Sequence, residues 1–171
     1  MPGRVQTLKS NNEAAQDERA PTTRESHMTV AAILAQKGQS IVSVTPEASI
    51  AEVTHVLAEH RIGAVLVCNE RGDLMGILSE RDIVASLAAD GASVLDQTAD
   101  HMMTRHVTTA VARTTVAQAM QMMTNGRFRH LPVLDMGRVI GVISIGDVVK
   151  ARMSQQEQEV DSLKAYVSGV A

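Results

Sequence analysis

The chain has 171 residues, 44% hydrophobic and 20% charged, which is the composition of a globular protein with one domain or two very small ones. Its net charge of −3, its lack of any block of Lys and Arg, and its aromatic content of 1% argue against a nucleic-acid partner. The single cysteine, Cys68, excludes an internal disulfide and a multi-cysteine metal site, and no apolar run approaches the ~18 residues of a membrane span.

The first 27 residues differ in composition from the rest of the chain. They combine prolines, asparagines and a balanced set of acidic and basic residues with little that could pack. We therefore interpret 1–27 as a disordered N-terminal tail without the apolar core of a secretion signal, in a cytoplasmic protein. Both Met1 and Met28 are possible initiators, since Met28 directly precedes the first helix-like segment.

The elements after the tail follow in a repeating order. A short helix over 29–37, ended by Gly38, comes first. Each of two units then has the order strand, helix, strand, strand, helix, with a glycine-containing hairpin turn between the central strands. The predicted strands are 41–44, 64–68 and 74–78 in the first unit and 107–109, 131–134 and 139–143 in the second. A loop at 90–93 and a short helix over 98–103 join the units.

Local patterns define the helices that follow the first strand of each unit. Ser49 and Glu52 form a capping box, and Thr115 begins the equivalent helix, which Gly126 is expected to end. The two units also align as a repeat, first at an offset of 66 and then of 65. We therefore predict an α/β fold of the α+β type with pseudo-two-fold symmetry and one shared core. The predicted boundaries are 28–92, 93–152 and, for a C-terminal helical extension, 153–171.

The C-terminal extension carries a heptad pattern. Its members recur at spacings of 4, 3, 4, 3 and 4, with one polar position: Val149, Met153, Gln156, Val160, Leu163 and Val167. Such a seam is typical of a coiled coil. A helix docked on its own domain would show the same pattern, so both interpretations stay open.

The strongest chemical signal is a motif of Gly, two apolar residues, Ser, two variable residues and Asp. It occurs as Gly76–Asp82 and again as Gly141–Asp147, where a strand ends and a helix begins. The helix N-terminus and the serine hydroxyl favour a phosphate, and the carboxylate can accept hydrogen bonds from the two hydroxyls of a ribose. For a single Ser-x-x-Asp, helix capping is the better explanation. Both copies keep Gly, Ser and Asp, while the two residues between Ser and Asp change freely, and this favours a ligand-binding role for the motif.

The motifs and the unit order resemble a tandem of cystathionine β-synthase-type (CBS) domains, a Bateman module, over about residues 29–152. The resemblance implies clefts between the units that bind AMP, ADP, ATP, NAD(H) or S-adenosylmethionine, with Ser at phosphate and Asp at ribose. One cleft would combine Ser144 and Asp147 with Ser40, Val42, Ile62, Gly63 and Ala64. The other would combine Ser79 and Asp82 with Thr104, His106, Thr108, Phe128 and Arg129.

A basic segment, Arg127-Phe128-Arg129-His130, precedes a strand of the second unit. The resemblance implies phosphate contacts at Arg129 and His130, and Arg81 between Ser79 and Asp82 could reach a phosphate too. The alternative is a pair of surface arginines with a partly buried histidine. Because the first unit has Gly63-Ala64 at the aligned positions, we expect the two clefts to differ.

The remaining candidates indicate packing rather than chemistry. His55, His60, His101 and His106 have spacings that do not suit a metal site, and Cys68 and the methionines 120, 122 and 123 are expected in the core. No nucleophile–base arrangement, Walker loop or dinucleotide motif is visible. Because these motifs are not visible, we predict no catalytic activity and no catalytic cofactor. The resemblance to CBS pairs implies a regulatory homodimer that binds an adenosyl ligand and acts on an effector protein. The rival hypothesis is a ligand-free dimerisation or scaffolding module.

Overall fold

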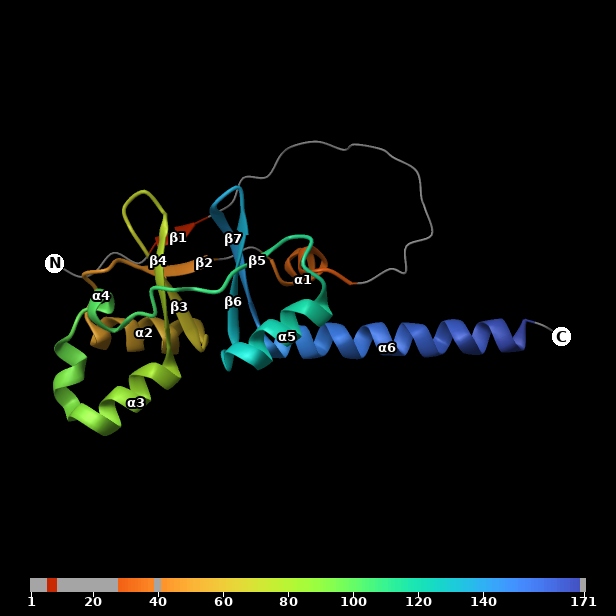
Figure 1. Ribbon diagram of the computed structural model, residues 1–171. Helices are drawn as coiled ribbons and strands as arrows, with labels where there is room; N and C mark the ends of the chain where they lie inside the picture. The colour runs from red at the N-terminus through yellow and green to blue at the C-terminus, as the bar shows by residue number, and fades with distance from the viewer. Residues whose placement is uncertain (1–5, 9–27, 39–40, 170–171) are drawn as a thin grey trace.

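A computed structural model describes residues 6–8, 28–38 and 41–169 (Figure 1). The predicted mixed α/β fold with two similar units is confirmed. The first unit contains β2 (Ile41–Val44), α2 (Ile50–His60), β3 (Ala64–Cys68), β4 (Leu74–Ser79) and α3 (Glu80–Asp90). The second contains β5 (Ala110–Val111), α5 (Val116–Gly126), β6 (His130–Asp135), β7 (Arg138–Ser144) and α6 (Ile145–Ser168). The connecting helices are α1 (Val30–Lys37), the 3-10 turn η1 (Gly91–Asp96) and α4 (Ala99–Met102).

Both units have the same sheet topology. In each, the first strand runs parallel to the second, and the second pairs antiparallel with the third. The registers match: Ala64 lies opposite Ser79 in the first sheet, and His130 lies opposite Ser144 in the second. This pairing places the start of the central strand beside the motif serine in each unit.

Local sequence signals account for most helix boundaries. The capping box of Ser49 and Glu52 is formed at α2, and Thr115 forms the same box with Gln118 at α5. Helix α5 ends at Gly126 as expected, but the glycine does not supply the left-handed conformation. Gly126 is the last helical residue, and Arg127 takes the left-handed conformation that closes the helix, at φ 55°. Gly126 instead leaves room for the ring of Phe128, which packs over it.

Two expected segments differ from the structure. Strand 107–109 is displaced to Ala110–Val111, because residues 106–108 cross between the units and line a cavity there. Within 1–27, residues Gln6–Leu8 form β1 and pair antiparallel with β2, so these residues depart from the predicted tail. The free edge of β2 offers unpaired backbone groups that β1 satisfies. The remainder of 1–27 lies outside the described residues.

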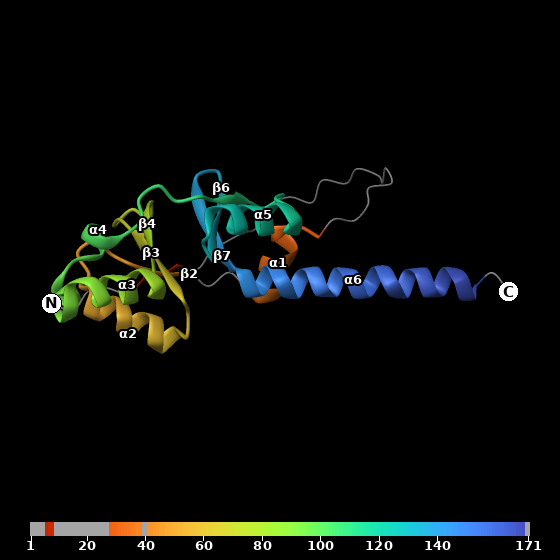
Figure 2. The ribbon, with the colours of Figure 1, turned by 60° about the horizontal axis from the view of Figure 1, so that its bottom comes forward.

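The segments before each unit exchange places in the fold. In α1, Val30, Ile33 and Leu34 belong to the core of the second unit, whereas Val94, Ala99 and Met103 belong to the core of the first. Backbone bridges join Thr29 to Thr115 and Thr98 to Ser49. Figure 2 shows α1 beside α5 and α6. The chain-order boundaries of 28–92 and 93–152 therefore do not coincide with the two cores.

The motif glycines make this exchange possible. A Cβ at Gly141 would lie 2.6 Å from Cδ2 of Leu34, and a Cβ at Gly76 would lie 2.5 Å from Sδ of Met103. Both neighbours are buried and come from the exchanged segments. Each glycine thus admits a side chain of the protein itself close to the strand backbone.

Substitution Gly141→Ala should lower the midpoint of thermal unfolding by several degrees. The added methyl group forces Leu34 to move in a packed core, at a cost of about 1–3 kcal/mol. Gly146→Ala is the matched control, because a Cβ there meets only Oγ of Ser144 at 3.6 Å and alanine favours the helix. Equal midpoints for the two variants would contradict the close-approach explanation.

Candidate functional site

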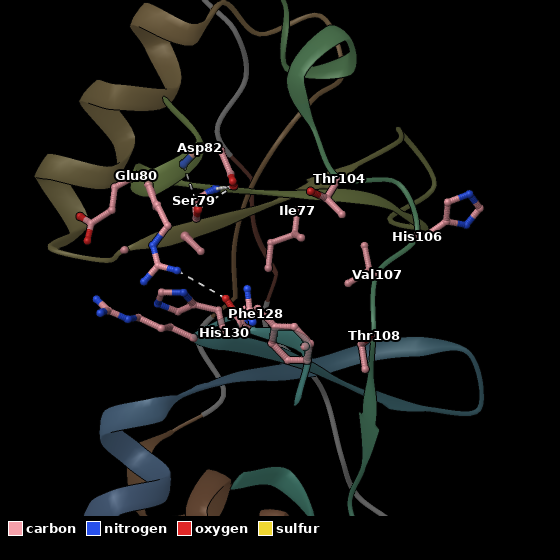
Figure 3. A pocket seen from close by; sticks show the side chains of 16 residues that line it. Ile77, Ser79, Glu80, Asp82, Thr104, His106, Val107, Thr108, Phe128 and His130 are labelled. Atoms are coloured by element: carbon pink, nitrogen blue, oxygen red, sulfur yellow. Dashed lines mark hydrogen bonds between the residues drawn. The ribbon is translucent and has the colours of Figure 1, made fainter. Parts of the chain in front are cut away.

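A cavity of about 410 Å³ lies between the two units, within the size range of small-molecule sites. Figure 3 shows side chains of both units around it. Its lining joins the end of β4 and the start of α3 to the crossing segment and the loop before β6. These residues are Gly63, Ala64, Ile77, Ser79, Glu80, Arg81, Asp82, Thr104, His106, Val107, Thr108, Gly126, Arg127, Phe128, Arg129 and His130.

The motif of the first unit forms one end of this cavity. Oγ of Ser79 donates a hydrogen bond to Oδ2 of Asp82 at 2.6 Å, and the backbone N–H of Ser79 donates to the same oxygen at 3.0 Å. The N–H of Asp82 donates back to Oγ of Ser79 at 3.3 Å. The capping alternative is therefore present in the structure. These bonds use one carboxylate oxygen of Asp82, so the other can still accept from a ligand.

The crossing segment forms an apolar wall. Thr104 and Ile77 exchange backbone hydrogen bonds of 2.9 and 3.1 Å, which fix the segment along β4. Val107 is half-buried and faces Ile77 across the cavity (Figure 3). The side chain of His106 points away from the cavity and is exposed (Figure 3). Ile77 and Val107 were not among the predicted site residues. Ile77 lies within the Gly76–Asp82 motif and Val107 lies in the crossing segment, and these positions are the signal that could have identified them as lining residues.

Arginines from both units also line the cavity. Nη1 of Arg81 donates to the backbone oxygen of Arg127 at 3.4 Å and so spans the two units. Arg127 and Arg129 are exposed. Three arginines therefore belong to the lining of one cavity, where bidentate contacts to a phosphate are possible.

His130 lies where the two units meet. A Cβ at Gly63 would come within 3.0 Å of Cε1 of His130, so the missing side chain of Gly63 makes room for the imidazole. Burial and the nearby Lys37 lower the pKa of His130 below its ordinary value of 6.5, against the opposing effects of Glu80 and Asp147. The imidazole is therefore neutral at pH 7 and can donate or accept one hydrogen bond on each side.

The grouping of predicted residues is partly corrected. Gly63 and Ala64 line the cavity with Ser79, although they were expected with Ser144, because Ala64 pairs with Ser79 across β3 and β4. Thr104, Thr108, Phe128 and Arg129 line it as expected, whereas His106 borders it with a side chain that points away (Figure 3). Val42 and Ile62 are half-buried against the core of the first unit, and Ser40 lies outside the described residues.

The motif of the second unit has a different environment. Ser144 and Asp147 form the same capping box, with 2.8 Å between Oγ and Oδ2. In addition, Nζ of Lys37 lies 2.6 Å from Oδ2 of Asp147 and donates to the backbone oxygen of Val142 at 3.2 Å. Burial acts to raise the pKa of Asp147, but hydrogen bonds from Lys37 and Ser144 outweigh it and hold that pKa below 3.8. Asp147 is thus already paired with a cation.

The other candidates occupy packing or surface positions. Cys68 is buried, burial raises the pKa of its thiol, and Met123 is buried with Met120 and Met122 packed beside it. His55, His60, His101 and His106 are all exposed. Within the described ranges, no three side chains of the metal-ligating types His, Cys, Asp and Glu gather at one point. No helix in the described part of the chain has the length and apolar character to cross a membrane.

The neutral state of His130 gives the fold a pH dependence. The unfolded chain binds a proton at this histidine near pH 6.5, whereas the fold resists it, so stability should fall as the pH drops below about 6.5. We expect a lower midpoint of thermal unfolding at pH 5.5 than at pH 7.5. His130→Gln should reduce that difference, and His101→Gln, at an exposed position, should leave it unchanged. If the midpoints at pH 5.5 and pH 7.5 differ as much in His130→Gln as in the wild type, His130 is not the source of the pH dependence.

The fold and the cavity together define a paired α/β module with a ligand-sized site between its units. The CBS domain model matches residues 36–89 and 99–154, and the chain belongs to the CBS domain family. The CBS domain-containing protein CBSX3, mitochondrial, of Arabidopsis thaliana is 30% identical over 168 residues, which cover 94% of this chain and 82% of that protein.

Two solved structures support the same assignment. A CBS-domain containing protein from Agrobacterium tumefaciens is 46% identical, with a TM-score of 0.72 over 73% of this chain and 99% of that one. A CBS domain protein from Pyrobaculum aerophilum, solved as a complex with AMP, is 27% identical, with a TM-score of 0.63 over 70% of this chain and 89% of that one. CBS pairs are generally regulatory rather than catalytic modules.

Proposed function

We propose that the chain is a regulatory module whose inter-unit cavity binds an adenosine-containing ligand. The observation that carries the proposal is the meeting of Ser79 and Asp82 from one unit with Arg127 and Arg129 from the other around one cavity. A similar protein binds AMP. Because the lining comes from both units, a bound ligand would bridge them and favour one arrangement of the pair over another.

Each part of the ligand has a suitable partner in the cavity. The adenine ring would lie between Ile77, Val107 and the backbone of the crossing segment, which suits a protein almost without aromatic residues. The ribose hydroxyls would donate to the free oxygen of Asp82. The phosphates would contact Arg81 at the start of α3, where the helix dipole favours an anion, and Arg129 from the second unit. The hydroxyl of Ser79 would join them by turning its proton from Asp82 to the phosphate.

The two motifs would not bind equally. Asp147 is held by Lys37 through the same Oδ2 that accepts the capping bonds, so a ribose at the second motif would have to share this carboxylate with a cation in a partly buried ion pair. Asp82 has no such competitor among the described residues. We therefore propose one preferred ligand site for each chain, at Ser79 and Asp82, in a non-catalytic homodimer.

The scaffolding hypothesis remains the second candidate, and the complete capping boxes favour it. Under this hypothesis, the motif serines and aspartates serve only to cap the N-termini of α3 and α6, and the cavity binds no ligand. The two hypotheses differ in one measurable respect: only the first makes Asp82 necessary for a response to nucleotide.

The wild-type chain should be stabilised by at least one of AMP, ATP, NAD(H) and S-adenosylmethionine in thermal unfolding. A ligand at 100 times its Kd stabilises by about 2.7 kcal/mol, which is roughly 5–11 °C at this size. Asp82→Ala should abolish the shift, whereas Asp147→Ala, which removes the same capping box from the other unit, should retain it. Each variant should itself lose about 0.5–2 kcal/mol of stability from the cap.

Three outcomes separate the hypotheses. A shift lost only in Asp82→Ala supports the proposed site. A shift lost only in Asp147→Ala moves the ligand to the second motif and refutes this assignment. No shift with any of the four ligands at millimolar concentration leaves the scaffolding module as the function.

Removal of the lysine should open the second motif. Lys37→Met keeps the aliphatic stem but frees Asp147, and we expect the number of nucleotides bound per chain to rise from one to two in titration calorimetry. Lys37→Arg retains a cation and is the matched control, with one nucleotide per chain. An unchanged stoichiometry in Lys37→Met would show that Lys37 does not control access to Asp147.

A further inference from the structure

The outer part of α6 presents an apolar stripe to solvent. The helix continues beyond the second unit (Figure 1), and its buried residues are Val148 and Ala151 near its start. The α6 seam is the heptad series Val149, Met153, Gln156, Val160, Leu163 and Val167, and its five apolar members are 43–75% exposed. In the structure, α6 therefore does not dock on its own domain along this seam, which excludes the second of the two interpretations of the heptad pattern.

The residue types in the C-terminal half of the α6 seam favour a particular pairing, whereas Val149 at d and Met153 at a are neutral in this respect. Val160 and Val167 occupy a positions and Leu163 occupies a d position. A β-branched residue at a with leucine at d favours two parallel helices. Gln156 provides one polar d position, and a single polar position in a seam fixes the register of the pair.

The flanking charges favour the same pairing. In a parallel pair, each g residue contacts the e residue five positions later on the partner helix. Arg152 then faces Glu157 of the second copy, and Glu159 faces Lys164, so both contacts join opposite charges. A fully overlapped antiparallel pair would place Glu157 against Glu157 and Glu159 against Glu159. The charges therefore discriminate between the two orientations.

We infer that the α6 seam binds the α6 seam of a second copy of this chain as a parallel, in-register, two-stranded coiled coil. The contact extends from Val149 to Val167, a length of ~27 Å. The seam begins in a groove that includes Val149, Lys150 and Met153, so the apolar stripe is continuous with the body of the second unit. The inference assigns an interface and an orientation to the proposed homodimer, and it does not rest on ligand binding.

Among the described residues of α6, the charges beside the seam make only contacts within the helix: Arg152 donates to Oε1 of Gln155 at 3.3 Å, and Nε2 of Gln155 donates to Oε1 of Glu159 at 3.2 Å. Nζ of Lys164 lies 3.7 Å from Oδ1 of Asp161, and both side chains are more than 70% exposed. Exposed pairs of this kind contribute little. Lys164 is therefore available to the second copy, and pairing of the seams removes six side chains per helix from water.

The mass of the full chain in solution tests the inference. Sedimentation equilibrium should give a dimer for the wild type and a monomer for Val160→Glu/Leu163→Glu. The matched control is Gln158→Glu/Ala165→Glu, which adds the same charge on the outer face of α6 and should remain dimeric. All four positions are exposed in the single chain, so neither variant should disturb the fold. A monomeric wild type, or a dimer that survives Val160→Glu/Leu163→Glu, overturns the inference.

Charge reversal and cross-linking test the orientation. Glu159→Lys should raise the dimer Kd roughly two- to thirtyfold, and Glu159→Lys/Lys164→Glu should restore it, because the exchange recreates both contacts between opposite charges. Leu163→Cys should form a disulfide-linked dimer under mild oxidation, since parallel register places the two positions side by side. Failure of the double variant to recover, or cross-linking of Leu163→Cys only with Met153→Cys, excludes the parallel arrangement.

Discussion

The exchange of the segments before each unit is the contact on which the rest of the structure depends. Neither unit covers its own core: α1 closes the second, and residues 94–103 close the first. Gly141 and Gly76 permit this exchange, since Leu34 and Met103 approach where a Cβ would otherwise lie. The exchange ties the units into one body. It also forces residues 104–108 to cross between them, which creates the apolar wall of the cavity.

The Ser-x-x-Asp motif serves the fold and the proposed ligand through different atoms. Oδ2 of Asp82 accepts the capping hydrogen bonds, and its second oxygen is left for another donor. Structural and binding roles are therefore compatible in one side chain. This also explains why loss of stability alone cannot separate them, whereas the response to nucleotide in Asp82→Ala and Asp147→Ala can.

The symmetry between the units is broken by a few residues, and this decides what each motif can do. Gly63 and Ala64 leave space where the second unit has Arg129 and His130, so the basic groups gather at one cavity. Lys37 pairs with Asp147, while the first unit supplies no cation to Asp82 in the described ranges. Duplication of a binding motif thus has not produced two equal sites.

Local signals in the sequence determined the repeat, the order of strands and helices, the capping boxes and the heptad seam, because each depends on residues a few positions apart. The resemblance to CBS pairs rested on these same signals. Only the tertiary structure decided that α1 packs on the second unit, that Gly63 and Ala64 lie beside Ser79, and that Lys37 reaches Asp147. The contacts of α1 and Lys37 join residues up to 110 positions apart, for which no local pattern exists, and the predicted hairpin alone did not show which cavity Gly63 and Ala64 would line. The tertiary structure also decided that the α6 seam is exposed, because the helix continues past the core of the second unit, which buries only Val148 and Ala151 of α6.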